Sequence, residues 1–385
     1  MLTSQKPEFQ LPDDITYLNC AYMSPQMKCV EEAGILNLKR KADPTSIYPD
    51  DFFNHTERVR KEFGQLINTS EVSRIAIIPS VSYGIANVVR NIKLENGDNI
   101  VVTGEQFPSN YYSWQKLCHQ HKAELRVVQA PEEVNGRGKI WNERIQESID
   151  TRTKAVALGH VHWADGTLFN LKDIRRRSSD VEALLIIDGT QSVGALPFDI
   201  QELQPDALIC AGYKWLLGPY SIGLAYYGPY FDSGVPIEEN WINRLGSEDF
   251  AGLVNYQETY RTDALRYGVG EQSNFILVPM LLKALEKLNE WKPENIQTYC
   301  KNITTSVLSD IKAAGFWVED LNYRSNHLFG IRPLIPVDER ALKEALSKAG
   351  VYVSVRGDAI RVGPHLYNTE EDLFKLAHVL KSFNR

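Results

Sequence analysis

The chain has 385 residues, 43% hydrophobic and 24% charged, a balance typical of a soluble globular protein that buries a large core. The formal net charge of -7 argues against a nucleic-acid-binding surface, and no apolar run approaches the roughly 20 residues of a membrane-spanning helix. A polar N-terminus, unlike a secretory signal, and five cysteines without metal-ligand spacing predict a cytoplasmic protein with buried thiols and no metal site.

Hydrophobic periodicity predicts alternating helices and short buried strands after a surface arm over residues 1–14. The first half is expected to contain helices over 26–40 and 52–67, a strand over 75–78, a helix over 83–92, and strands over 99–103, 125–130 and 154–161. Strands over 184–187, 207–211 and 221–227, the last of them antiparallel and closing the sheet, lead to a long helix over 276–291. The remaining expected elements are helices over 293–314 and 339–349, strands over 316–318, 327–331 and 351–355, and a final helix from residue 369. This pattern predicts an α/β fold with a large domain over 15–275, built on a mostly parallel seven-stranded sheet, and a smaller α+β domain over 276–385.

The stretch from Leu184 to Pro219 carries the strongest chemical signal. Asp188 stands where its first apolar run ends, and Lys214 stands just past the end of the second. Because ligands of an open α/β sheet bind outside the carboxyl ends of its strands, both charges are expected in one crevice. Pyridoxal 5'-phosphate (PLP) needs such a pair, a lysine amine for its aldehyde and a carboxylate that keeps its ring nitrogen protonated. Burial of Lys214 beside Trp-Leu-Leu would favour the free amine.

Three segments, DGTQSVGALPFDI, GYKWLLGP and SIGLAYYG, resemble the cofactor segment of class V aminotransferase-fold enzymes. This fold type I PLP-dependent transferase family includes cysteine desulfurases, kynureninase and isopenicillin N epimerase, and the resemblance runs from about Tyr17 to the C-terminus. It implies that Lys214 is the Schiff-base lysine and Asp188 the pyridinium partner. It also implies a homodimer with a shared active site, in which Gln272 and Ser273 reach the phosphate of the neighbouring subunit.

The resemblance assigns further cofactor contacts in the large domain. Val81, through its backbone, and Ser82, through its hydroxyl, match the positions that grip the phosphate. Unpaired N–H groups at the start of the following helix make an anion site there, although Ser82 is by itself also a candidate N-cap. Phe107 matches the ring that stacks on the cofactor, Gln191 the amide that reaches its phenolic oxygen, and Tyr213 a phosphate-binding tyrosine.

The substrate side of the site is assigned in the same way. In the C-terminal segment VSVRGDAIRVGPHLYNTEED, Arg361 matches the arginine that pairs with the α-carboxylate of an amino-acid substrate. A planar bidentate guanidinium suits that task, and Arg356 is a second candidate next to it. Near the N-terminus, the loop around Ala21 and Tyr22 matches the border of the substrate pocket.

Departures from the family pattern decide between its branches. Desulfurases carry their reactive cysteine on a loop between the positions of Arg356 and Arg361, but here only residues 357–360 lie between them and none is cysteine. Trp163 stands where desulfurases have an asparagine, and Gln191 stands where kynureninases usually have a histidine. These differences predict that the protein is neither a cysteine desulfurase nor a kynureninase.

The remaining prediction is a PLP-dependent aminotransferase acting on a free amino acid. An epimerase or a β-lyase on the same scaffold is the alternative, and a non-enzymatic binding module is a third hypothesis. His160 and His162 are open to two interpretations, as acid–base groups or as structural histidines at a strand end. The sequence does not identify which amino acid is the substrate.

Overall fold

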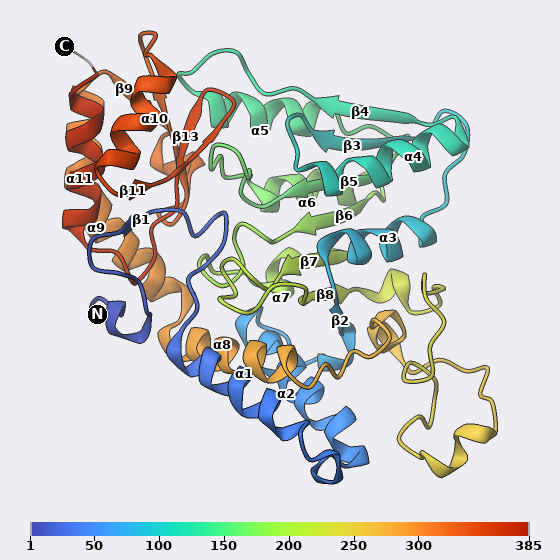
Figure 1. The fold of residues 1–385 in the computed structure, drawn as a ribbon. Coiled ribbons are helices and arrows are strands. Elements are labelled where there is room, and N and C mark those ends of the chain that lie inside the picture. Colours follow the sequence, from blue (N-terminus) through green and yellow to red (C-terminus); the bar gives the residue numbers. More distant parts are fainter. Residues whose placement is uncertain (1, 384–385) are drawn as a thin grey trace.

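In the computed structural model, which describes residues 2–383, a seven-stranded sheet forms the centre of the larger part of the chain (Figure 1). Its strands are β2 (Ile75–Ile78), β3 (Asn99–Thr103), β4 (Glu124–Val128), β5 (Thr153–Gly159), β6 (Leu184–Asp188), β7 (Ala207–Ala211) and β8 (Gly223–Tyr227). They lie in the order β2-β8-β7-β6-β5-β3-β4, and β8 runs in the opposite direction to the other six strands. The predicted mostly parallel sheet is confirmed. The prediction that β8 closes it is wrong, because β8 lies between β7 and β2 and the edge belongs to β2.

Helices cover both faces of this sheet, which explains why its strands read as continuous apolar runs. Side chains of α3 (Val81–Asn91) and α4 (Tyr112–His121) pack on one face. The other face belongs to a second core that includes α2 (Asn54–Leu66), α5 (Arg137–Glu147), α6 (Leu171–Ser179) and α8 (Leu277–Trp291). Two further helices are α1 (Lys28–Arg40), which packs along α8, and the short α7 (Ile200–Leu203) between β6 and β7. Successive residues of one strand point to opposite faces, so Ile77 packs in the core with α2 and Ile78 packs in the core with α3.

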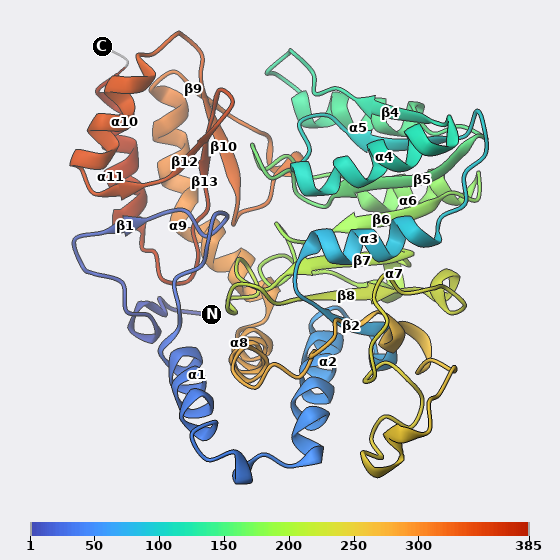
Figure 2. The same cartoon turned by 45° about the vertical axis from the view of Figure 1, so that its right-hand side comes forward.

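The smaller domain has a four-stranded antiparallel sheet in the order β12-β13-β10-β9 (Figure 2). Its strands are β9 (Phe316–Val318), β10 (Phe329–Pro333), β12 (Ser354–Arg356) and β13 (Ala359–Val362). Its helices are α9 (Pro293–Ala313), α10 (Glu339–Lys348) and α11 (Glu370–Lys381). No helix in the described residues 2–383 has the length and apolar character needed to cross a membrane.

The N-terminal segment packs on the smaller domain. β1 (Thr16–Tyr17) pairs in parallel with β11 (Val351–Tyr352), so the strand expected over 351–355 is divided between two sheets. Phe9 is buried against Trp291 and Tyr367, so the segment expected to lie on the surface contributes to the core. This pairing attaches β1 to the smaller domain, and the division of the chain into domains over 15–275 and 276–385 stays a prediction.

Candidate active site

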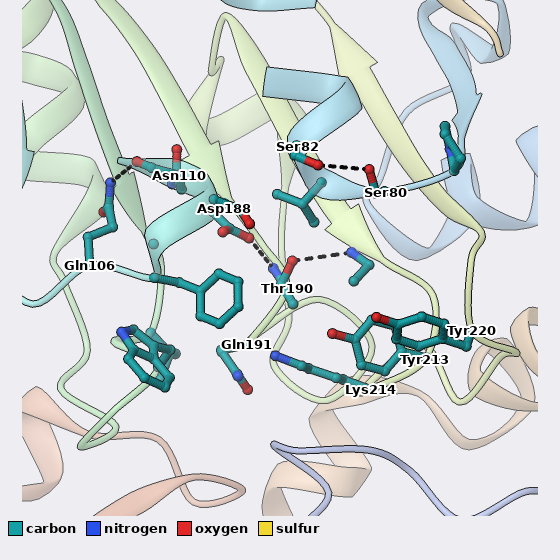
Figure 3. A pocket seen from close by; sticks show the side chains of 18 of the residues that line it. Ser80, Ser82, Gln106, Asn110, Asp188, Thr190, Gln191, Tyr213, Lys214 and Tyr220 are labelled. Atoms are coloured by element: carbon teal, nitrogen blue, oxygen red, sulfur yellow. Dashed lines mark hydrogen bonds between the residues drawn. The ribbon is translucent and has the colours of Figure 1, made fainter. Parts of the chain in front are cut away.

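A cavity of about 320 Å³ opens at the carboxyl ends of the central parallel strands (Figure 3). Asp188 is the last residue of β6, and Lys214 follows the end of β7 by three residues. The structure places both side chains in the wall of this cavity, as the two strand ends predict. The other predicted cofactor contacts that line it are Val81, Ser82, Phe107, Gln191 and Tyr213.

Lys214 is 7% exposed, and its Nζ has no hydrogen-bond or ion-pair partner among the described residues. Burial, with the positive charge of Arg361 as the next cause, lowers the pKa of its ammonium to about 8. The turn that carries Lys214 is closely packed. Gly194 lies against it with φ +104°, and a Cβ there would stand 2.1 Å from the carbonyl oxygen of Trp215. The lysine is therefore held in place and is partly a free amine near neutral pH.

Asp188 accepts a hydrogen bond at Oδ1 from the backbone N–H of Thr190 at 3.0 Å. Burial raises the pKa of its carboxyl, so a cationic N–H donor in the cavity would stabilise the ionised form. Thr190 is a residue that sequence reasoning missed. Its Oγ1 accepts from the backbone N–H of Ala211 at 3.2 Å and so ties the ends of β6 and β7 together.

The first turn of α3 forms another wall of the cavity (Figure 3). Ser80 is the N-cap, accepting from the backbone N–H of Tyr83 at 3.3 Å, so the N-cap interpretation of Ser82 is wrong. Ser82 is the second residue of the helix, and its hydroxyl is 3.0 Å from that of Ser80. Free N–H groups and hydroxyls at a helix N-terminus suit a phosphate.

Two tyrosines form the wall below this helix end. Tyr213 packs against Tyr220 with ring centroids 4.5 Å apart, and both rings line the cavity (Figure 3). Sequence reasoning missed Ser80 and Tyr220. A serine directly before a helical run is a signal that would have identified Ser80. No local sequence pattern identifies Tyr220 as a cavity residue, because the turn after β7 decides where its side chain lies.

Aromatic residues form the opposite wall. The centroid of the Phe107 ring is 5.6 Å from Nζ of Lys214, and the ring meets Trp163 edge-to-face at 5.3 Å. The indole N–H of Trp163 donates to the carbonyl oxygen of Glu105 at 2.6 Å, which fixes the orientation of the indole. Phe107 therefore lines the cavity close to Lys214, and its packing against a planar cofactor stays a prediction.

The two histidines differ in their surroundings. His162 lines the cavity, but its ring nitrogens contact Asp165 Oδ1 at 3.1 Å and the Glu105 carbonyl oxygen at 3.2 Å. His160 lies outside the cavity against Phe198, and burial lowers its pKa to about 3. These contacts favour the structural interpretation for both.

On the substrate side, Arg361 is buried, and its Nη1 donates to the carbonyl oxygen of Trp163 at 2.7 Å. Its Nε is also buried and has no hydrogen-bond partner among the described residues. Gln191 donates from Nε2 to the carbonyl oxygen of Ala21 at 3.1 Å, and its Oε1 accepts from the indole of Trp215 at 2.8 Å. One amide N–H of Gln191 is left for a cofactor oxygen. The neighbouring Tyr22 is 55% exposed.

Among the predicted site residues, the following do not line the cavity: Gln272, Ser273, Arg361, Arg356, Ala21 and Tyr22. Gln272 and Ser273 are buried in the segment before α8. The amide of Gln272 accepts from Arg60 Nη2 at 2.7 Å and donates to Asn243 Oδ1 at 3.4 Å. Their contact with a neighbouring subunit's phosphate stays a prediction.

A cavity at the carboxyl ends of parallel strands, with an unpaired buried lysine, a buried carboxylate and a helix N-terminus, defines the fold type I class of PLP-dependent enzymes. The chain belongs to the aminotransferase class-V family, whose model matches residues 46–376. As a member of this family it is an enzyme that uses PLP. The cavity residues fit that cofactor, since they offer a separate partner for its aldehyde, its ring nitrogen and its phosphate.

Similar proteins extend over nearly the whole chain. An uncharacterized aminotransferase of Schizosaccharomyces pombe is 25% identical, with 98% of this chain and 94% of the relative covered. A cysteine desulfurase of Escherichia coli O8 is 26% identical, with 86% and 82% covered. Among solved structures, a C-DES mutant with glycine covalently linked to its PLP cofactor has a TM-score of 0.86 at 17% identity, covering 99% of this chain and 100% of that chain. The likeness to that structure shows the fold.

Proposed function

We propose that the protein is an aminotransferase that acts on a free amino acid through Lys214. The observation that carries this proposal is the unpartnered Nε of Arg361. Its Nη1 donates to the Trp163 carbonyl oxygen and its Nη2 donates a long 3.5 Å hydrogen bond to the Ser354 hydroxyl, whereas its buried Nε has no partner among the described residues. Nε and Nη2 form one edge of a planar fork that matches the two oxygens of a carboxylate. An α-carboxylate bound there would bring the α-carbon towards Lys214, whose pKa the charge of Arg361 lowers.

The remaining side chains have separate tasks in this proposal. PLP, when bound, accepts the electrons of a bond broken at the substrate's α-carbon. The amine of Lys214 removes and returns the α-proton as a general base, because part of it is unprotonated near neutral pH. Asp188 holds the ring-nitrogen proton, and Phe107 packs against the ring. The N-terminus of α3, with Ser82 and Tyr213, holds the phosphate.

Cysteine desulfurases are among the relatives, but the buried thiols of Cys20 and Cys210 do not support that activity. A persulfide acceptor needs an accessible thiol that ionises readily. The turn between β12 and β13 consists of Gly357 and Asp358. Cys20, whose Sγ is 3.9 Å from the carbonyl oxygen of Lys214, is buried, and burial raises its pKa to about 12. Burial also raises the pKa of Cys210.

The proposal includes a homodimer in the cytoplasm. Between β8 and α8 an irregular segment, 229–276, projects from the sheet in both views (Figures 1 and 2). It exposes large apolar side chains, including Leu245, Val254 and Tyr256. Such side chains favour burial against another surface, for which a second copy of the chain is the proposed partner. Light scattering of the purified protein would measure twice the chain mass, whereas a monomer that retains PLP would contradict the shared site.

The test is a visible absorption spectrum of the purified protein followed by titration with L- and D-amino acids. We expect a band from lysine-bound cofactor that is lost in Lys214→Ala and kept in Lys139→Ala, whose side chain is 62% exposed. An amino acid should convert the band to that of the cofactor amine and release the matching keto acid. Ammonia with pyruvate, or an inverted amino acid, would instead indicate a lyase or an epimerase.

A second measurement tests the exclusion of desulfurase activity. L-Cysteine is added to the holoenzyme, and the protein is analysed by mass spectrometry for an added sulfur atom. We expect no persulfide on any cysteine. A persulfide that disappears in Cys20→Ala would refute the argument from burial of that thiol.

A further inference from the structure

Two guanidinium groups lie on the same face of one hairpin beside the candidate active site. In the β12–β13 hairpin, Ser354 is directly opposite Arg361 and Arg356 is opposite Ala359. Residues two apart on a strand point to the same face, so Arg356 shares the face of Ser354 and of its partner Arg361. Diagonal neighbours of this kind are within reach of long side chains. The register of the hairpin therefore presents both arginines together.

Both guanidinium groups also pack on one aromatic ring. The Cζ atoms of Arg356 and Arg361 are 5.6 Å and 6.0 Å from the ring centroid of Trp163. Trp163 in turn meets Phe107, whose ring centroid is 5.6 Å from Nζ of Lys214. Three cationic side chains therefore surround one pair of aromatic rings, and the charges of both arginines lower the pKa of Lys214.

No carboxylate in the described part of the chain pairs with either arginine. The hydrogen bond of Arg356 goes to the carbonyl oxygen of Val355 at 2.9 Å, and the salt bridges among described residues do not include it. Asp358, in the turn next to it, is 2.9 Å from Arg332 instead. Asp188 has the cofactor ring as its expected partner. Both guanidinium groups are therefore available to bind anionic groups of a ligand.

A single α-carboxylate neutralises only one of the two positive charges of Arg356 and Arg361. The edge of Arg361 that carries the unpartnered Nε takes that carboxylate in the proposed function, and this leaves Arg356 without an anion. A neutral or apolar substrate side chain would leave the partly buried guanidinium of Arg356 without an anion, which is unfavourable. A second anionic group on the substrate removes this cost and adds a charge-assisted hydrogen bond.

We propose that the substrate is an amino acid whose side chain carries a second anionic group, of the carboxylate class, and that Arg356 binds it. This inference rests on the proposed function, since it assigns the α-carboxylate to Arg361.

Binding of amine-free acids tests the inference without any turnover. Succinate and glutarate carry two carboxylates, and butyrate carries one. By calorimetry on the PLP-loaded protein, we expect at least one of the two dicarboxylates to bind about tenfold or more tightly than butyrate, the contribution of one charge-assisted hydrogen bond. Arg356→Gln should abolish this preference and leave butyrate binding within about twofold. Arg361→Gln should weaken both kinds of acid. Arg340→Gln, whose side chain on α10 is 90% exposed, is the matched control and should change neither.

Spectral titration with amino acids distinguishes the inference from the proposed function. Aspartate and glutamate should change the cofactor band at lower concentration than asparagine and glutamine, and Arg356→Gln should remove the difference. Equal binding of acidic and neutral amino acids, with keto acid released from both, would overturn the inference and leave the proposed function standing. Equal weakening of butyrate and dicarboxylates by Arg356→Gln would overturn it too, because Arg356 would then serve the α-carboxylate. If no amino acid changes the band but dicarboxylates are still preferred, the proposed function fails and the second anion site remains.

Discussion

The lowered pKa of Lys214 predicts how the rate of cofactor capture depends on pH. A lysine with the ordinary value of 10.5 is a free amine in about one molecule in 3,000 at pH 7, whereas a pKa of about 8 raises this to about one in ten. The gain in reactive amine is about 300-fold. Because only the free amine attacks an aldehyde, the rate constant for capture of added PLP by the cofactor-free protein should rise about tenfold per pH unit below pH 8 and level off above it.

The assay is stopped-flow absorption of the lysine-bound band between pH 6 and 10. Arg361→Gln removes a like charge near the amine, so the pKa of Lys214 should rise and the inflection should move to higher pH. Arg340→Gln, on the exposed face of α10, should leave the inflection in place. A rate that keeps rising through pH 10 in the unmodified protein would refute the argument that burial makes Lys214 reactive near neutrality.

Three further predictions concern the site and its supports. Asp188→Asn should retain the cofactor band but lower kcat about 100-fold or more, because the ring-nitrogen proton loses its anionic partner; steady-state kinetics would measure this, and an unchanged kcat would contradict the role. Asp165→Asn leaves buried arginines without their anion and should destabilise the protein by about 3 kcal/mol in denaturant unfolding, whereas Glu344→Gln in an exposed ion pair should cost less than about 1 kcal/mol. Gly194→Ala forces a Cβ against the carbonyl of Trp215 at positive φ and should lower both thermal stability and PLP retention; wild-type behaviour in both would show that the turn relaxes freely.

The local pattern of the sequence was enough to predict most elements and the chemical centre. The strands β3 (Asn99–Thr103) and β7 (Ala207–Ala211) lie at their predicted residues, because a short apolar run between turn residues is a local signal. Asp188 and Lys214 could be placed together for a related reason: both follow strand ends, and the ends of parallel strands share one edge of a sheet. The family resemblance then supplied the cofactor, which the family match confirms.

Tertiary structure alone decided which segments became neighbours. Pairing of β1 with β11 joins residues more than 300 positions apart, and the insertion of β8 between β7 and β2 depends on the whole sheet. The same holds for the packing of the Tyr220 ring against the tilted ring of Tyr213. Periodicity fixes which face of a strand is apolar, but it carries no information about the partner strand.

The arginines show this division most clearly. The sequence shows that Arg361 and Arg356 stand five positions apart in a segment that resembles the family. Only the register of the β12–β13 hairpin put them on one face, and only the fold brought Trp163 from β5's end beneath both. The physical reason is that strand propensity and turn chemistry act over a few residues, whereas the charge environment of a site is summed over every segment that folds around it.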